Sequence, residues 1–376
     1  MCWSGNTPFS TMSDGNPLRI LLIGASGVFG SRLAERIALE PNMALTLAGR
    51  RRAPLDVLAA QIGGGAVRML DRSRVEPRDL AGYDLIIDAA GPFQASTTTL
   101  VEAAIAAKVD YVDLADGREW IASFAQFDLA ARAAGVSLVA GASSIPALSH
   151  AVLDQLVAGW REIETIWIGI FPGNRAPRGL SVVEAILSYA GKPVRVFKEG
   201  RWTRQWGWGA LTRVDAGPAG RRWASVCDTP EQDLLVARYH PTRSAEFFAG
   251  MELTLLHLGL SLLSWPVRLG WVDSIRQLAR PLLSIAQWLL PFGGDRGAML
   301  IDVRGVDRSG NPVDTRWLLS AEANRGPYVP VLAALVMARR RRDGHREPPG
   351  ARICSGLLAL SDFDEDFATL GIKIGS

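Results

Sequence analysis

The stretch from Leu18 to Arg52 constrains the fold more than any other part of the chain. An apolar run ends at Gly24, two more glycines follow at Gly27 and Gly30, and a helical pattern begins at once. This order predicts a strand, a tight turn and a helix. A turn without side chains lets a phosphate approach closely, and the amides at the positive end of the helix stabilise its charge. The stretch therefore indicates a dinucleotide-binding site.

The alternation of short apolar runs with amphipathic helical patterns continues as far as Ser144. Such alternation predicts consecutive βαβ units and a parallel, doubly wound Rossmann sheet. The helix after the glycines shows its buried stripe in Phe29, Leu33 and Ile37. A further helix is expected over 97–108, with Ser96 as its N-cap. The expected strands are 18–23, 44–48, 67–70, 85–89, 111–114 and 137–140.

A chain of 376 residues exceeds what one core usually organises, so we expect two domains in an α/β protein. The nucleotide domain is predicted over 17–145. Period-2 patterns at 165–171, 194–197, 299–306 and 315–323 predict a mixed or antiparallel sheet in a second, α+β domain over 146–326. This second domain would serve substrate binding or dimerisation. We expect residues 327–376 to return to helix and short strand and to pack back on the nucleotide domain.

A strongly apolar insertion over 253–292 interrupts the second domain. It predicts two or three helices broken at Pro266 and Pro281. Its apolar runs are too short to cross a bilayer. Three interpretations stay open: a buried helical pair, a homodimer interface, or an interfacial hairpin that admits a lipophilic substrate. In the last case, Arg268, Arg276 and Arg280 would lie near lipid headgroups.

Composition excludes several classes of protein. Apolar residues make up 48% and charged residues 21%, as in ordinary globular proteins. The net charge of +3 and the scattered Lys and Arg argue against a nucleic-acid partner. Three distant cysteines imply neither a disulfide framework nor a metal site, which fits a cytoplasmic location, with peripheral membrane association as the alternative. Residues 1–16 lack a signal-peptide pattern and predict a disordered leader, in which Met12 is an alternative start.

The end of the second strand predicts the choice of cofactor. It carries Arg50 and no Asp or Glu, which would bind a ribose hydroxyl. A guanidinium pairs with a 2′-phosphate and can stack on adenine, so we expect NADP rather than NAD. A solvated basic turn is the alternative. Asp71, after the third strand, would lie near the adenine or cap a helix.

Small residues follow the fourth strand and leave room for a cofactor, because the carboxyl ends of parallel strands line the ligand crevice. Together with the glycine loop they complete the predicted cofactor site. Its members are Gly24, Ser26, Gly27, Val28, Phe29, Gly30, Arg50, Asp71, Ala89, Ala90, Gly91, Pro92 and Phe93.

Three residues are candidates for catalysis. Asp116 follows the fifth strand, near the expected reaction centre, although loop aspartates often form turns. His150 begins a helix after the sixth strand and could donate a proton, because the pKa of histidine is easily tuned near neutrality. Tyr328 is a similar candidate. For both of these, a structural role is the alternative.

Several motifs resemble the saccharopine dehydrogenase-like family of NAD(P)-dependent reductases. They are the glycine loop with Arg50, the Ala-Ala-Gly-Pro-Phe stretch ending at Phe93, Tyr-Val-Asp-Leu ending at Leu114, and Gly-Ala-Ser-Ser-Ile-Pro ending at Pro146. The resemblance implies a Rossmann domain, a mixed-sheet domain that shapes the substrate pocket, and hydride transfer.

Saccharopine reductases bind a two-headed amino-acid substrate, for which basic and polar anchors would be expected. This chain instead has the apolar insertion and many tryptophans, among them Trp202, Trp206, Trp208 and Trp223. We therefore expect an NADPH-dependent reductase that acts on a C=N, C=C or C=O bond of a small metabolite. A lipophilic metabolite is one candidate. One alternative is an enoyl reductase acting on lipid or polyketide intermediates. Another is a membrane-associated nucleotide-binding protein without turnover.

Overall fold

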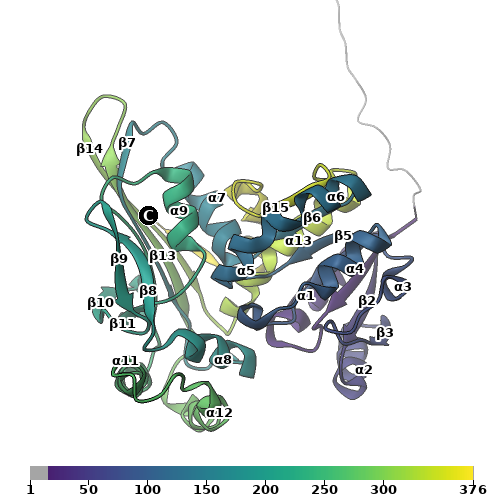
Figure 1. Cartoon of the computed structure of the whole chain (residues 1–376), viewed down its shortest axis with the longest axis horizontal. Helices are drawn as coiled ribbons and strands as arrows, with labels where there is room; N and C mark the ends of the chain where they lie inside the picture. The colour runs from purple at the N-terminus through teal and green to yellow at the C-terminus, as the bar shows by residue number, and fades with distance from the viewer. Residues whose placement is uncertain (1–15, 376) are drawn as a thin grey trace, which may run out of the picture.

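The computed structural model describes residues 16–375, so the predicted leader lies outside the described residues except for its last one. Two sheets organise the chain. Figure 1 shows a parallel sheet with helices on its faces on the right and a mixed sheet on the left. The fold class predicted from the sequence, a Rossmann sheet plus a second α+β unit with a mixed sheet, is confirmed.

The first sheet has seven parallel strands in the order β15-β6-β5-β4-β1-β2-β3. Strands β1 and β4 are almost continuously apolar because helices cover both faces of the sheet. The strands are β1 (Leu18–Ile23), β2 (Met43–Gly49), β3 (Ala66–Met69), β4 (Leu85–Asp88), β5 (Asp110–Asp113) and β6 (Ser137–Ala140). The helices are α1 (Val28–Ile37), α2 (Arg52–Gln61), α3 (Pro77–Leu80), α4 (Thr99–Ala107), α5 (Arg118–Ser123) and α6 (Asp128–Ala134). All six strands predicted from the alternation are present, with ends shifted by one residue or so.

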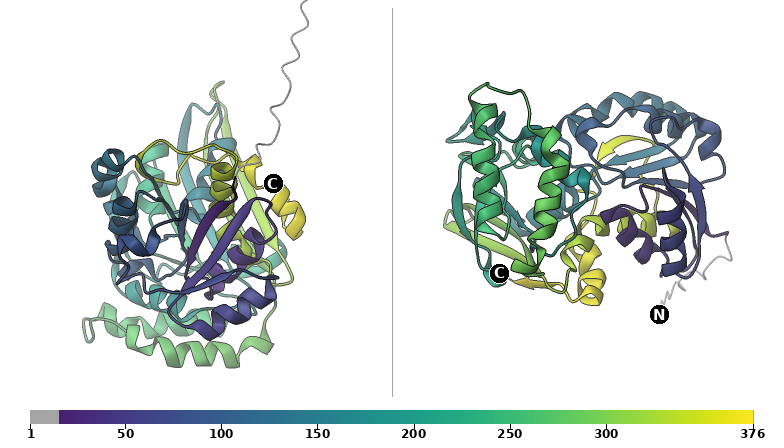
Figure 2. Two further views of the ribbon diagram at one scale, coloured as in Figure 1. Left: turned by 90° about the vertical axis from the view of Figure 1, so that its right-hand side faces the viewer. Right: turned by 90° about the horizontal axis from the view of Figure 1, so that it is seen from below.

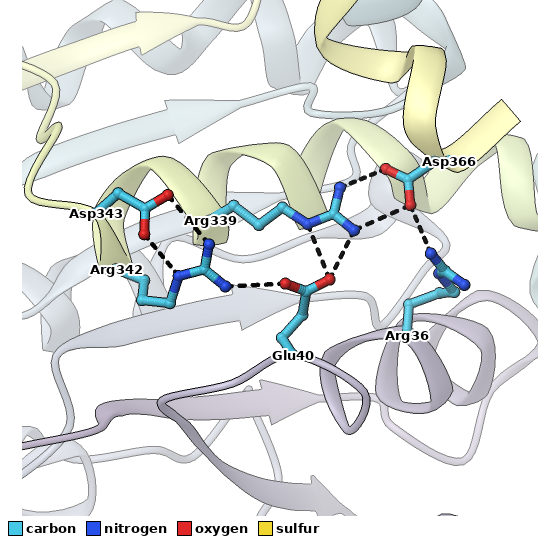
Figure 3. A network of polar contacts seen from close by, with 6 residues as sticks. All are labelled: Arg36, Glu40, Arg339, Arg342, Asp343 and Asp366. Carbon is cyan, nitrogen blue, oxygen red and sulfur yellow. Dashed lines mark hydrogen bonds and ion pairs between the residues drawn. The ribbon is translucent and has the colours of Figure 1, made fainter. Parts of the chain in front are cut away.

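The end of the chain returns to this sheet. Strand β15 (Gly350–Ile353) pairs in parallel with β6, and helix α13 (Val329–Arg342) packs on α1. Helix α14 (Asp364–Leu370) follows, and β16 (Lys373–Gly375) pairs with β14 of the second sheet. Figure 3 shows the polar network that joins α13 and α14 to α1 and the residues after it, made by Arg36, Glu40, Arg339, Arg342, Asp343 and Asp366.

The second sheet runs β10-β11-β12-β7-β13-β14-β16, with β8 beside β12 and β9 beside β8. It is mixed because β7 and β12 are parallel while its other strand pairs are antiparallel. Its strands are β7 (Glu162–Phe171), β8 (Pro193–Lys198), β9 (Arg201–Trp206), β10 (Thr212–Asp215), β11 (Arg221–Val226), β12 (Ser244–Ala249), β13 (Gly297–Val306) and β14 (Pro312–Ala321). Helices α7 (Ser149–Leu156), α8 (Leu180–Tyr189) and α9 (Glu231–Tyr239) accompany it.

The apolar insertion forms α10 (Thr254–Leu263), α11 (Trp265–Arg268) and α12 (Ala279–Trp288). Pro266 lies in the first turn of α11, directly after the break that follows α10. The break predicted at Pro281 is wrong, because this proline lies in the first turn of α12, where a missing amide costs no helical hydrogen bond. Within residues 16–375, none of the helices has the length and apolar character needed to cross a membrane.

Candidate cofactor and active site

The glycine loop between β1 and α1 is closed by contacts that admit no larger residue. Gly24 has a φ of +76°, and a Cβ there would lie 2.8 Å from Ala90. A Cβ on Gly30 would lie 2.2 Å from the carbonyl oxygen of Gly24. The amide of Gly27 donates to that same oxygen at 2.9 Å. The loop therefore lies directly against the residues that follow β4.

The start of α1 offers unpaired donors to an anion. No side chain caps this helix. Within the described chain, the amides of Val28, Phe29 and Gly30 have no hydrogen-bond partner. Ser26 is exposed beside them, with its hydroxyl close to Gly49 at the end of β2. Amides of a first helical turn that converge on a side-chain-free loop suit the pyrophosphate of a dinucleotide.

The residues after β4 form the next part of the crevice. The amide of Ala90 donates to buried Asp88 at 2.9 Å, and burial raises the pKa of that carboxyl. Ala89, Ala90 and Pro92 are partly buried and Gly91 is exposed. The small side chains of Ala89 and Ala90 let the glycine loop pack closely against this segment.

Arg72, which was not predicted as a site residue, holds the segment after β4 in place. It donates to Asp88 at 2.9 Å and to the hydroxyl of Ser96 at 3.1 Å, and its guanidinium lies 5.4 Å from the centroid of the Phe93 ring. Phe93 is buried. Phe93 therefore contributes to the predicted cofactor site indirectly, by packing behind the residues that line it. Ser96 does not cap the next helix as predicted, because α4 begins at Thr99 and the Ser96 hydroxyl binds Arg72.

Two arginines lie near Asp71: Arg50 directly follows β2, and Arg74 lies in the turn after β3. Arg50 and Arg74 are both exposed, and within the described chain neither forms an ion pair or a side-chain hydrogen bond. Asp71 accepts from the amide and hydroxyl of Ser73 at 3.0 and 2.8 Å, which lowers its pKa, and both arginines lie near enough to lower it further. Asp71 thus closes a turn and caps no helix, since α3 is capped by Glu76.

The structure places Asp116 in a group that contains residues from both sheets. Its exposed carboxylate accepts from Nε2 of Gln94 at 3.4 Å. The other amide atom of Gln94, Oε1, is buried without a partner in the described residues. Tyr189, at the end of α8, contacts the thiol of Cys227. Burial, Cys227 and the nearby Asp116 together hold the pKa of Tyr189 well above its ordinary value.

The start of helix α8, at the opposite end from Tyr189, contacts the nucleotide domain. A Cβ on Gly179, just before the helix, would lie 3.5 Å from Cγ2 of Val28. A Cβ on Gly91 would lie 3.8 Å from Cβ of Ser181. Figure 1 shows α8 between the mixed sheet and α1. The start of α8 therefore covers the junction of the glycine loop and the β4 segment.

His150 is buried, and both of its ring nitrogens are engaged. Nε2 lies 3.0 Å from Oε2 of Glu231, and Nδ1 lies 2.7 Å from the hydroxyl of Ser355. The ring joins α7 to α9 and to the end of the chain. This geometry favours a structural role over the predicted proton donor.

Tyr328 is held against α1. Its hydroxyl donates to Glu35, and the guanidinium of Arg32 lies 5.4 Å from its ring centroid. Burial and Glu35 raise its pKa. These contacts favour packing of the C-terminal helix on α1 over the predicted catalytic role.

Asp113, at the end of β5, organises the loops around the crevice. Its carboxylate accepts from the amides of Ala115 and Gly141 at 3.0 and 2.8 Å and from the indole of Trp120 at 2.8 Å. Burial raises its pKa to about 6. Fully buried and surrounded by donors, it is a structural carboxylate.

Comparison with known proteins agrees with this geometry. Residues 20–153 match the family model described as the saccharopine dehydrogenase NADP binding domain. This stretch is therefore similar to the nucleotide-binding domain of saccharopine dehydrogenases. The match spans β1 to α7 and includes the glycine loop, Arg50 and Asp116. The resemblance inferred from the sequence motifs is confirmed over this domain.

Solved structures extend the likeness in fold to the whole chain. Saccharopine dehydrogenase (L-Glu forming) from Saccharomyces cerevisiae is 13% identical, with 95% of this chain and 99% of that one covered and a TM-score of 0.64. A meso-DAPDH variant from Clostridium tetani E88 is 15% identical, with 94% and 99% covered and a TM-score of 0.46. No match was found among curated protein sequences. The NADP-binding domain and the shared saccharopine dehydrogenase fold indicate an NAD(P)-dependent oxidoreductase.

Proposed function

We propose that the chain is an oxidoreductase that uses NADPH and reduces a C=N, C=C or C=O bond of a small, uncharged and lipophilic metabolite. The observation that carries the choice of NADPH is the pair Arg50 and Arg74, which are exposed near Asp71 and have no side-chain partner within residues 16–375. Two guanidinium groups there suit a 2′-phosphate, whereas a ribose hydroxyl would call for a carboxylate acceptor.

Exchanging these arginines tests the cofactor. Arg50→Glu and Arg74→Glu should each weaken NADPH binding by roughly tenfold to a hundredfold, because charged hydrogen bonds contribute about 1.5–3 kcal/mol. NADH binding should change little. Arg78→Glu, another exposed arginine, on α3, is the matched control. Equal affinity of the wild-type protein for NADPH and NADH, measured by calorimetry, would refute the assignment.

Tyr189 is the proton donor in this proposal. A bound nicotinamide would supply the hydride, while this chain must hold the substrate and deliver a proton. The hydroxyl of Tyr189 is protonated near neutral pH, as in any tyrosine, so it can donate a hydrogen bond to the substrate. Its raised pKa makes it a weaker acid, so it gives up the proton only to the strongly basic anion that hydride addition leaves on the substrate. Gln94, with its unpaired Oε1, would help to orient the substrate or the cofactor.

The ion pairs of Arg118 argue against a substrate that carries a carboxylate. Arg118 follows the Asp116 loop, but it donates to Asp233 through Nε at 2.5 Å and through Nη2 at 2.8 Å, and to Asp228 at 3.0 Å. Because these carboxylates neutralise it, Arg118 is not available to anchor a substrate carboxylate. The polar side chains beside Asp116, which are Gln94 and Tyr189, are uncharged at neutral pH.

A panel of substrates tests the proposed substrate class. NADPH oxidation should occur with apolar enoyl, carbonyl or imine compounds and be weak with amino acids paired with 2-oxo acids. Activity restricted to the amino-acid pairs would overturn the substrate class and leave the cofactor assignment intact. No turnover with any compound, together with tight NADPH binding, would favour a nucleotide-binding protein without catalysis.

A further inference from the structure

The apolar insertion presents an unusual amount of large apolar side chain to solvent. Of the seventeen large hydrophobic residues that are exposed in the described chain, nine lie between residues 255 and 292. We call this set the insertion face: Leu255, Leu262, Trp265, Leu269, Trp271, Val272, Ile285, Trp288 and Phe292. Such clustering marks an interaction surface, whereas single exposed apolar residues would need no explanation.

The helices of the insertion are apolar on both sides. On α10, Leu255 and Leu262 are 72% and 71% exposed and lie two turns apart on one side, while Leu260 is buried on the other. On α12, Trp288 is 75% exposed, and Ala286 faces the interior. Figure 2 (right) shows the two green helices crossing the same outer face of the second domain. Folding against this domain therefore accounts for only one side of each helix.

The charges of the insertion have one predominant sign. Residues 253–292 contain Arg268, Arg276 and Arg280 but only one acid, Asp273. Arg280 is exposed, and its guanidinium has no partner in the described residues. Arg276 lies 3.7 Å from Glu184 of α8. Arg268 donates to the carbonyl oxygen of Trp208, so Arg280 is the guanidinium that this surface offers to a partner of negative charge, beside the exposed Asp273.

We propose that the insertion face docks on an anionic phospholipid bilayer, with α10 and α12 lying in the plane of the membrane interface. Helices of ten residues each cannot span a bilayer, but they can bury one apolar side at the boundary between headgroups and acyl chains. Tryptophan is suited to this boundary, because its ring is apolar and its N–H can reach polar groups. Three of the nine residues are tryptophans.

Docking in this way would bring the crevice close to the membrane. Helix α12 packs on α8, whose first residues contact the glycine loop and the β4 segment. Helices α12 and α8, each about 10 Å across, thus lie between this part of the insertion face and the predicted cofactor site. This relationship gives a lipophilic compound a short path from the bilayer, but the docking itself does not depend on the proposed reaction.

Flotation with vesicles tests the proposal. The full chain should float with vesicles of phosphatidylcholine and phosphatidylglycerol, float less with phosphatidylcholine alone, and be released by salt. Trp271→Ser combined with Trp288→Ser should weaken binding by roughly tenfold or more. Arg280→Gln should weaken it by roughly fivefold on anionic vesicles only. The control is Trp202→Ser combined with Trp206→Ser, which removes exposed tryptophans of β9 and should leave binding unchanged.

NADPH binding and thermal unfolding establish that each variant is folded. Failure of the wild-type protein to float with anionic vesicles would overturn the proposal, and so would equal losses in the face and control variants. Sedimentation velocity in the absence of lipid tests the alternative that a second copy of the chain covers the insertion face. If the wild-type protein is a dimer that the Trp271 and Trp288 substitutions dissociate, the face binds a second copy of the chain and the membrane assignment is wrong.

Discussion

Arg36 and Asp366 stand 330 positions apart in the chain, yet their charged groups meet at 2.7 Å. The side chain of Asp366 is completely buried and also accepts from Arg339. One carboxylate of α14 thus joins two arginines, one from the first helix and one from α13 (Figure 3). The attachment of the C-terminal segments to α1 depends strongly on this group.

Replacing this carboxylate should be costly. Asp366→Asn leaves two arginines short of a buried counter-charge and should lower the free energy of unfolding by about 3 kcal/mol. Chemical denaturation measures the change. Asp314→Asn, in the exposed pair with Arg304, is the control and should cost less than about 1 kcal/mol. Similar losses in the two variants would contradict a special role for Asp366.

Gly24→Ala should impair both the fold and the cofactor site. A non-glycine residue at positive φ costs about 1–3 kcal/mol, and the added Cβ would also press against Ala90. Gly310→Ala is a matched control, because Gly310 has a φ of +89° with open space around it. The difference between the two variants in thermal unfolding reports the contact with Ala90. NADPH affinity should fall only in Gly24→Ala.

Tyr189→Phe should lower kcat by roughly a hundredfold to ten-thousandfold, the range for loss of a general acid. Binding of NADPH should be unchanged, because the hydroxyl acts on the substrate. Tyr328→Phe is the control and should retain kcat while losing some stability through the bond to Glu35. Steady-state rates and cofactor titration distinguish the two. A large loss of kcat in Tyr328→Phe, with kcat unchanged in Tyr189→Phe, would show that Tyr328 is the catalytic residue.

Asp113 should give stability an unusual dependence on pH. Its pKa is raised to about 6 in the folded protein, above the ordinary value of 3.8, so the folded state holds the proton more tightly. The corresponding stabilisation is present below about pH 4 and is lost as the pH rises through 6, by roughly 1.4 kcal/mol per unit of pKa.

The non-titrating variant Asp113→Asn isolates this effect. The advantage of the wild-type protein over the variant, measured by denaturation at each pH, should shrink between pH 4 and 6 and then stay constant. An advantage that grows over this range would show that burial does not dominate at Asp113.

The nucleotide domain was predictable because its signals are local. Buried parallel strands are short apolar runs, and the three glycines of the loop are required by turn geometry, so the sequence pattern carries both. Arg50 was found through its place after β2. Arg74 was missed because it does not directly follow β3, and the turn at Asp71 carries it to the same region as Arg50.

The catalytic candidates were harder to predict because they depend on how distant segments pack. Tyr189 lies on a helix of the second domain, and nothing in its local sequence distinguishes it from a core tyrosine. His150 and Tyr328 looked suitable by residue type, but their partners, Glu231 and Glu35, are brought to them by the tertiary fold. Strands β9 to β12 were missed. In β9 the usual alternation is inverted, because the half-buried Thr203 and Gln205 are polar while the exposed residues include two tryptophans.

The pairing of β15 with β6 bears on the order in which the protein can be made. During synthesis strands β1 to β6 leave the ribosome first, but the edge strand of their sheet begins at Gly350, 210 positions after β6 ends at Ala140. Until residues 350–353 emerge, the edge of β6 presents unpaired amides and carbonyls to the surroundings. The glycine loop can therefore form early, while the sheet that supports it is completed only after β15 has been translated.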